Sequence, residues 1–131
     1  MFKALIAFFC LYLSAGCTGL PGRSGDVLLK TEMYFGMNRQ GGGEVATAEW
    51  QAFVDTCITR EFTDGFTVVD ARGQWQNGNG ATEREHSRIL IIIHPDTDDL
   101  ERRIELVRES YKHAFRQQSV LRVTAPVRAS F

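Results

Sequence analysis

The chain has few cysteines and lacks the spacings by which cysteine and histidine usually bind metals. Its three cysteines are Cys10, Cys17 and Cys57, and no Cys-x-x-Cys or His-x-x-x-His pattern occurs anywhere in the sequence. A structural zinc site is therefore not expected. The sequence predicts no metal and no cofactor.

The chain also has no large excess of positive or negative charge. Lysine and arginine together number 15 and aspartate and glutamate 16, for a formal net charge of −1, and both signs are mixed along the chain. Without a basic block, nothing favours nucleic acid as a partner. The glycine-rich stretch 36–43 is not followed by Gly-Lys-Ser/Thr, so a phosphate-binding loop is not expected. No catalytic motif is recognisable, which favours a role other than catalysis.

No apolar run is long enough to cross a bilayer. The longest runs from Ala4 to Leu13, about half of the roughly twenty residues that a membrane-spanning helix needs. Lys3 precedes it and Ser14-Ala15-Gly16-Cys17 follows it. This pattern predicts a secretory signal peptide over residues 1–16.

The end of that segment resembles the lipobox of bacterial lipoproteins, in which the cysteine carries the lipid. We therefore expect lipidation of Cys17 and a membrane anchor, with residues 17–26 as a glycine-rich flexible tether. Thr18, by resemblance to enterobacterial sorting rules, predicts the periplasmic side of the outer membrane. The alternative is an ordinary signal peptide cut near Gly16 or Gly19, which gives a secreted or periplasmic protein without lipid.

Residues 27–131 are predicted to form a single domain of α+β class. Hydrophobic spacing and turn residues indicate six elements. They are a strand over 27–35, a helix from Thr47 as N-cap to residue 62, strands over 66–75 and 85–94, a helix capped by Asp96 or Thr97, and a strand over 119–127.

This β-α-β-β-α-β order predicts a ferredoxin-like fold, with a four-stranded antiparallel sheet of order 4-1-3-2 and both helices on one face. The five apolar residues from Ile89 to Ile93 further predict that the third strand is central and covered on both faces.

Several segments of the chain together resemble a known family. They are Tyr34-Phe35-Gly36, Gly43-Glu44-Val45, Glu49–Phe53, Phe62–Val68, Gly73-Gln74-Trp75, Glu85–Arg88, Tyr111-Lys112 and Gln117–Val123. With these segments the chain is similar to the bacterial family of small exported proteins called domain of unknown function 3574. The resemblance covers nearly all of the chain after the predicted signal peptide. It supports fold and location, and implies no activity.

The predicted topology brings polar residues from four segments to one edge of the sheet. They are Asn38, Arg39, Glu44, Gln74, Trp75, Glu85, Arg88, Gln117 and Ser119. Polar groups and an aromatic ring that converge on loops indicate a ligand-binding site. The alternative is that these residues build turns, helix caps and surface ion pairs.

The sheet face without helices is a second candidate site. Strand alternation is expected to place Lys30, Glu32 and Tyr34 on it. The same alternation predicts five polar and two apolar residues of the neighbouring strands there: Asp70, Arg72, Gln74, Arg122, Thr124, Leu90 and Ile92. Glu32 and Arg122 would form a ligand clamp or, alternatively, a cross-strand ion pair. We expect this face to pair two copies as a homodimer.

The sequence thus predicts an exported, lipid-anchored binding or accessory module of the cell envelope, with an unknown small-molecule or protein ligand. One alternative is a small cofactor-independent enzyme of the dimeric α+β barrel type, with a pocket on the sheet face. Another is a purely structural interaction protein. Cys57 lies on the apolar stripe of the first helix and is expected to be packed rather than reactive.

Overall fold

The computed structural model describes residues 25–130, so the predicted signal peptide over residues 1–16 and the predicted lipidation of Cys17 lie outside the described residues. The elements are β1 (Asp26–Gly36), α1 (Thr47–Phe53), η1 (Val54–Ile58), α2 (Thr59–Glu61), β2 (Thr67–Gln76), β3 (Thr82–His94), α3 (Asp98–Phe115) and β4 (Leu121–Ala129). The π-helical turn η1 joins α1 and α2 into one continuous helical run.

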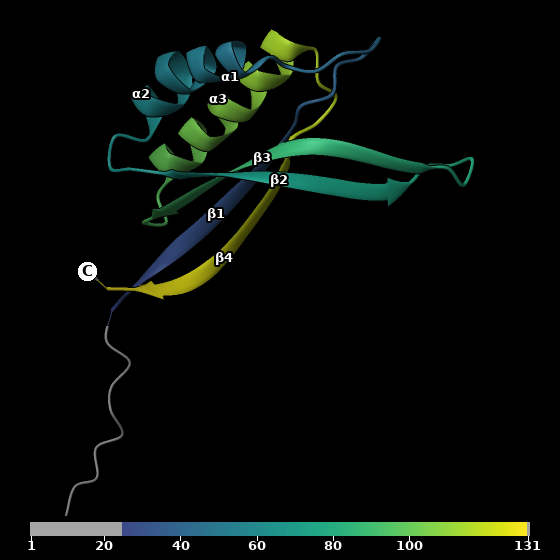
Figure 1. The fold of residues 1–131 in the computed structure, drawn as a ribbon. Helices are drawn as coiled ribbons and strands as arrows, with labels where there is room; N and C mark the ends of the chain where they lie inside the picture. The colour runs from purple at the N-terminus through teal and green to yellow at the C-terminus, as the bar shows by residue number, and fades with distance from the viewer. Residues whose placement is uncertain (1–24, 131) are drawn as a thin grey trace, which may run out of the picture.

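The four strands form one antiparallel sheet in the order β2-β3-β1-β4. Read from the other edge this is the predicted order 4-1-3-2, so the α+β class and the sheet topology are confirmed. The helical run α1–α2 and helix α3 lie on the same face of the sheet (Figure 1). The β2–β3 hairpin extends beyond the helices, and within residues 25–130 the opposite face of the sheet carries no helix (Figure 1).

The core lies between the sheet and the helices and is built around five aromatic rings. Phe35 of β1 packs edge-on against Tyr111 of α3, with ring centroids 4.7 Å apart. Trp50 lies 5.4 Å from Phe35, and Phe53 lies 5.8 Å from Phe115. Edge-to-face contacts of this kind stabilise beyond the area that they bury, so the cluster holds β1, α1 and α3 together.

The helix caps agree with the sequence at one helix only. Thr97 caps α3, since its hydroxyl accepts a hydrogen bond from the Leu100 amide at 3.3 Å. The prediction that Thr47 caps the first helix is wrong, because Ala46 holds the N-cap position. The Glu49 carboxylate accepts a hydrogen bond from the Ala46 backbone N–H at 2.9 Å, which is the half of a capping box that the residue three places into the helix supplies.

The strand register shows which side chains face the helices. Residues opposite each other in register share a face, and Met33, which is fully buried, lies opposite Leu90 and Arg122. We call the sheet surface that faces away from the helices the open face. Its larger side chains include those of Leu28, Lys30, Glu32, Tyr34, Val69, Trp75, Glu83, Glu85, Ser87, Ile89, Ile91, Ile93, Leu121, Val123 and Val127.

Lys30, Glu32 and Tyr34 therefore lie on the open face as expected, but the facing predicted for their neighbours is wrong. The residues that face the helices instead are Asp70, Arg72, Gln74, Leu90, Ile92, Arg122 and Thr124. In β4 the polar positions point inward because partners are available there. Arg122 meets the Glu101 carboxylate of α3 at 2.6 Å, and Thr124 bonds Thr31.

The expectation that β3 is covered on both faces is also wrong. The strand is central, but helices cover only the side of Leu90 and Ile92, while Ile93 on the open face is 41% exposed. The apolar run thus reflects one buried face and one apolar face that faces outward.

A buried polar chain crosses the sheet beneath α3. Thr31 bonds His94 Nε2 and the Thr124 hydroxyl, both at 2.9 Å, and His94 Nδ1 donates to the Pro95 carbonyl at 2.8 Å. In the neutral imidazole, Nε2 is then the acceptor of the Thr31 hydroxyl. Thr31 is fully buried and His94 is nearly so, which makes this contact costly to remove.

Replacement of Thr31 by valine tests this chain. The change keeps the side-chain shape and leaves His94 Nε2 buried without a donor, so we expect a loss of about 1–3 kcal/mol in the free energy of unfolding. Urea denaturation measures it. The matched control Thr67→Val, at an exposed position of β2, is expected to stay within about 0.5 kcal/mol of the wild type. Equal stability of both variants would contradict the assignment.

Candidate functional site

The loop that follows β1 is held in place by contacts from both helices. The Tyr111 hydroxyl donates to the Gly36 carbonyl at 2.8 Å, and Gln117 Nε2 donates to the Asn38 carbonyl at 2.7 Å. Arg39 donates to the Glu49 carboxylate at 2.6 Å and lies 5.8 Å from the centroid of the Phe115 ring. These ties position residues 36–39 beside β3.

A carboxylate lies directly over the end of β1. Glu85 Oε1 accepts a hydrogen bond from the backbone N–H of Asn38 at 3.1 Å. A Cβ atom at Gly36 would lie 2.5 Å from the same oxygen, nearer than two such atoms can approach. The Glu85 carboxylate therefore occupies space that is free only because residue 36 is a glycine without a side chain.

Around this point the open face is hollowed into a depression of about 510 Å³, which we call the edge pocket. Its volume is in the range of small-molecule sites. It is lined by Tyr34, Gly36, Asn38, Arg39, Gln40, Trp75, Glu85, Ser87, Gln117, Gln118, Ser119 and Leu121.

Seven of the predicted site residues meet in the edge pocket, although they come from segments far apart in the chain. They are Tyr34, Asn38, Arg39, Trp75, Glu85, Gln117 and Ser119. The sequence reasoning missed five lining residues, Gly36, Gln40, Ser87, Gln118 and Leu121. All of them except Gln40 stand in segments that carry the family resemblance.

The chemistry of the edge pocket combines aromatic surface with hydrogen-bonding groups. Trp75 is 48% exposed, and the Tyr34 hydroxyl donates to Glu32 at 2.7 Å. That bond to Glu32, together with burial, raises the pKa of Tyr34 above its usual value, so the phenol stays protonated at neutral pH. Because Arg39 is paired with Glu49, the Glu85 carboxylate gives the pocket acidic character.

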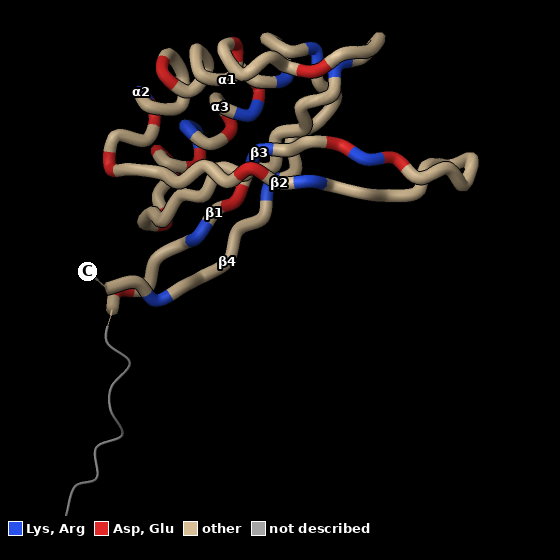
Figure 2. Tube along the Cα trace, in the orientation of Figure 1, with Lys and Arg blue, Asp and Glu red and all other residues tan. Residues whose placement is uncertain are grey.

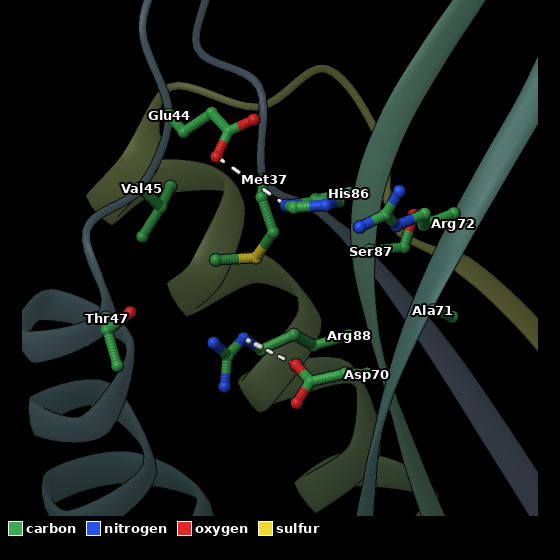
Figure 3. A pocket seen from close by; sticks show the side chains of 10 residues that line it. All are labelled: Met37, Glu44, Val45, Thr47, Asp70, Ala71, Arg72, His86, Ser87 and Arg88. Atoms are coloured by element: carbon green, nitrogen blue, oxygen red, sulfur yellow. Dashed lines mark ion pairs between the residues drawn. The ribbon is translucent and has the colours of Figure 1, made fainter.

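Three residues predicted at the edge site, Glu44, Gln74 and Arg88, line cavities on the other side of the sheet. Arg88 lines a cavity of about 660 Å³ between the β2–β3 ribbon and the loop before α1, which we call the ribbon pocket (Figure 3). It is lined by Met37, Glu44, Val45, Thr47, Asp70, Ala71, Arg72, His86, Ser87 and Arg88. Gln74 lines an adjoining depression of about 450 Å³ and accepts a hydrogen bond from Arg84 at 2.9 Å.

The predicted pairing of Glu32 with Arg122 does not form. Glu32 lies on the open face and pairs with Lys30 at 2.8 Å, and contacts with Lys30 and Tyr34 lower the pKa of its carboxyl. Arg122 points to the helices, where Glu101 and Glu105 bind it. The two side chains stabilise opposite faces of the sheet and neither lines the edge pocket.

The remaining predictions concern metals, the thiol and the membrane. Within residues 25–130 no group of three or more histidine, cysteine, aspartate or glutamate side chains is arranged to hold a metal ion. Cys57 is a free, partly buried cysteine packed against the core, and burial raises the pKa of its thiol. Among the helices that the structure describes, none has the length and apolar character to cross a membrane.

The family model described as "Protein of unknown function (DUF3574)" matches residues 30–131. The chain belongs to the DUF3574 family. This confirms the family that the sequence motifs indicated. Comparison with curated proteins gives no match.

Solved structures share the fold of this DUF3574 protein at low sequence identity. A phage SAM lyase in complex with S-methyl-5'-thioadenosine is 18% identical, with a TM-score of 0.56 over 84% of this chain and 96% of that chain. The same enzyme in its apo state gives 19% identity and a TM-score of 0.55 over 80% and 92%. CutA from Synechococcus elongatus PCC7942 gives 8% identity and a TM-score of 0.53 over 82% and 83%.

Replacement of Gly36 by alanine tests the arrangement of the edge pocket. The added methyl group is expected to displace the Glu85 carboxylate and break its bond to the Asn38 amide, with less than about 1 kcal/mol lost in stability because the Glu85 carboxylate can swing away. The backbone amide resonance of Asn38 in NMR spectra reports the loss of this hydrogen bond. In the control Gly78→Ala, where a methyl group meets open space, this resonance stays in place. An unmoved Asn38 resonance in Gly36→Ala would refute the arrangement.

Proposed function

We propose that this protein is an exported, lipid-anchored module of the cell envelope that binds a small molecule in the edge pocket. The observation that carries the proposal is the meeting of seven predicted site residues in one depression of about 510 Å³. We also assign the domain to the ferredoxin-like type, which its β-α-β-β-α-β order and one-sided helices support.

The position of the edge pocket fits a tethered protein. β1 begins at Asp26, the last residue of the predicted tether, and the pocket lies at the other end of the strand, beside Gly36. With about 3.3 Å per residue, the strand separates the two points by about 33 Å. A lipid on Cys17 would therefore be attached near the end of β1 that is remote from the pocket.

The lining of the edge pocket favours a flat ligand with hydrogen-bond donors. The half-exposed Trp75 offers a ring surface for stacking, and Glu85 offers a carboxylate at its side. Gln118 and Ser119 are exposed and lie at the rim. A neutral or cationic ring compound bearing hydroxyl or amino groups matches these contacts.

The lipid anchor is tested by the mass of the mature protein purified from membranes of its own source. We expect cleavage before Cys17 and a mass increased by the lipid groups, because a single cysteine follows the small-residue cleavage site. The variant Cys17→Ser should lose the added mass and leave the membrane fraction. A mature protein without added mass, starting at another residue, would contradict the anchor and support the soluble alternative.

Ligand binding is tested by the tryptophan fluorescence of the protein, in which Trp75 is the exposed ring and Trp50 the buried one. With the small-molecule fraction of an envelope extract we expect a saturable change in emission, because a stacked ligand alters the surroundings of the ring. Gln117→Ala removes the bond that holds Asn38 and should weaken binding about threefold to tenfold, the equivalent of one hydrogen bond. The control Gln51→Ala, at an exposed position of α1, should bind like the wild type. Identical titrations for all three proteins would count against the site.

A second candidate function is that of a small cofactor-independent enzyme of the dimeric α+β barrel type. The observation that favours it is the apolar open face, where Leu121 is 60%, Val123 45% and Ile93 41% exposed. A second copy of the chain packed on this face would remove these side chains from water. It would also cover the edge pocket, which opens on the same face, and so make a closed site.

The fold shared with the phage SAM lyase suggests S-methyl-5'-thioadenosine as the probe for this second function. We expect the probe to bind the homodimer and to bind Trp75→Ala at least tenfold more weakly, because the adenine ring loses its stacking partner. Sedimentation and calorimetric titration measure both properties. Val123→Glu, which puts a charge on the open face, should yield a monomer that no longer binds. A wild-type protein that is monomeric and does not bind the probe would exclude this function in favour of the binding module.

A further inference from the structure

The ribbon pocket is a second cavity, on the side of β3 opposite the edge pocket. Side chains alternate along β3, so Glu85 belongs to the edge pocket while His86 and Arg88 face the ribbon pocket. Acidic and basic residues also alternate along this part of the strand (Figure 2). The side chains that β3 gives to the two cavities therefore differ in charge: Glu85 is acidic, whereas His86 and Arg88 are basic. The ribbon pocket also contains Asp70 and Glu44, from β2 and the loop before α1.

Arg88 is held in a fixed orientation at the floor of the ribbon pocket. Its guanidinium lies 5.4 Å from the centroid of the Trp50 ring, and its Nε lies 3.5 Å from Asp70 Oδ1. The side chain is 22% exposed. Its two terminal nitrogens point away from Asp70 into the cavity (Figure 3). A guanidinium fixed in this way presents the planar pair of donors that binds a carboxylate or phosphate through two hydrogen bonds.

Two further basic side chains line the same wall. Arg72 of β2 lies opposite His86 of β3. This pair is two residues along the strands from the pair of Asp70 and Arg88, on the same face of the sheet. Diagonal neighbours in such a ladder are about 7–8 Å apart, so Arg72 and Arg88 can reach one anion together. Across residues 25–130, Arg72 forms no ion pair, unlike Arg88.

We propose that the ribbon pocket binds a small organic anion through its phosphate or carboxylate group. Arg88 and Arg72 hold the anionic group, and the apolar part of the molecule lies against Met37 and Val45. Both apolar residues are almost fully buried at the opposite wall. A cavity of about 660 Å³ is much larger than an inorganic ion and falls within the range of organic ligands.

The acidic residues of the ribbon pocket limit the charge of its ligand. Asp70 is paired with Arg88, and Glu44 lies 3.7 Å from His86 Nδ1. Their carboxylates would repel a polymer with many negative charges, because like charges at short range are destabilising. The cavity therefore suits one anionic group on a small molecule and not a nucleic acid.

NMR titration of the whole protein with phenyl phosphate, benzoate and inorganic phosphate at constant ionic strength tests this proposal. We expect saturable shifts of the Arg72, His86 and Arg88 resonances with phenyl phosphate or benzoate, and at least tenfold weaker binding of inorganic phosphate, which lacks the apolar part. Preference for phenyl phosphate identifies a phosphate ligand, and preference for benzoate identifies a carboxylate.

Variants decide whether the guanidinium groups carry the binding. Arg88→Lys keeps the charge but removes the paired donors, and should weaken binding about tenfold. Arg72→Gln changes an exposed residue and should weaken it severalfold with the fold intact, which keeps the test valid should Arg88→Lys be unstable. The control Arg102→Gln, on the exposed face of α3, should bind like the wild type. Wild-type affinity in Arg72→Gln, or no saturable binding by the wild type, would overturn the proposal.

Discussion

The hydrogen bond from the Tyr111 hydroxyl to the Gly36 carbonyl fixes the point at which the sheet ends and the loop begins. Tyr111 is fully buried among the aromatic rings of the core, and this burial raises the pKa of its phenol. The hydroxyl therefore remains a donor, and its 2.8 Å bond to Gly36 ties α3 to the last residue of β1. The hydrogen bond thereby positions the start of the loop before α1, where the Asn38 backbone N–H meets the Glu85 carboxylate.

β3 is the element that both cavities share. Its odd-numbered residue Glu85 lies under the edge pocket, while the even-numbered His86 and Arg88 line the ribbon pocket. The aromatic core also reaches the second cavity, because the Trp50 ring supports the Arg88 guanidinium. The packing that stabilises the domain thus orients the charged groups on both of its faces.

The sequence was sufficient for the topology and for the convergence of polar residues at one edge. The spacing of hydrophobic residues indicated the helices and strands, the Asn-Gly turn indicated the hairpin, and Gly36 indicated the end of the first strand. It was insufficient for the facing of β4, because alternation gives two faces without saying which is inward. The polar side chains of Arg122 and Thr124 face the helices because they form hydrogen bonds there, with Glu101 and Thr31 respectively. Such partners lie far away in sequence.

The same limit applies to the candidate sites. Six of the nine residues that the predicted topology grouped at one edge line the edge pocket, together with Tyr34, which was predicted on the sheet face without helices. The ribbon pocket needed the register of β2 against β3, which places Arg72 one step from Arg88. A shift of the register by a single residue would have moved both to the other face.

The central claim is that the edge pocket holds a small molecule in the native protein. Native mass spectrometry of the protein purified gently from its own envelope tests it most directly. We expect a discrete adduct with the wild type that is released on denaturation and is missing from Trp75→Ala. A wild type without an adduct, or an adduct retained in full by Trp75→Ala, would contradict it.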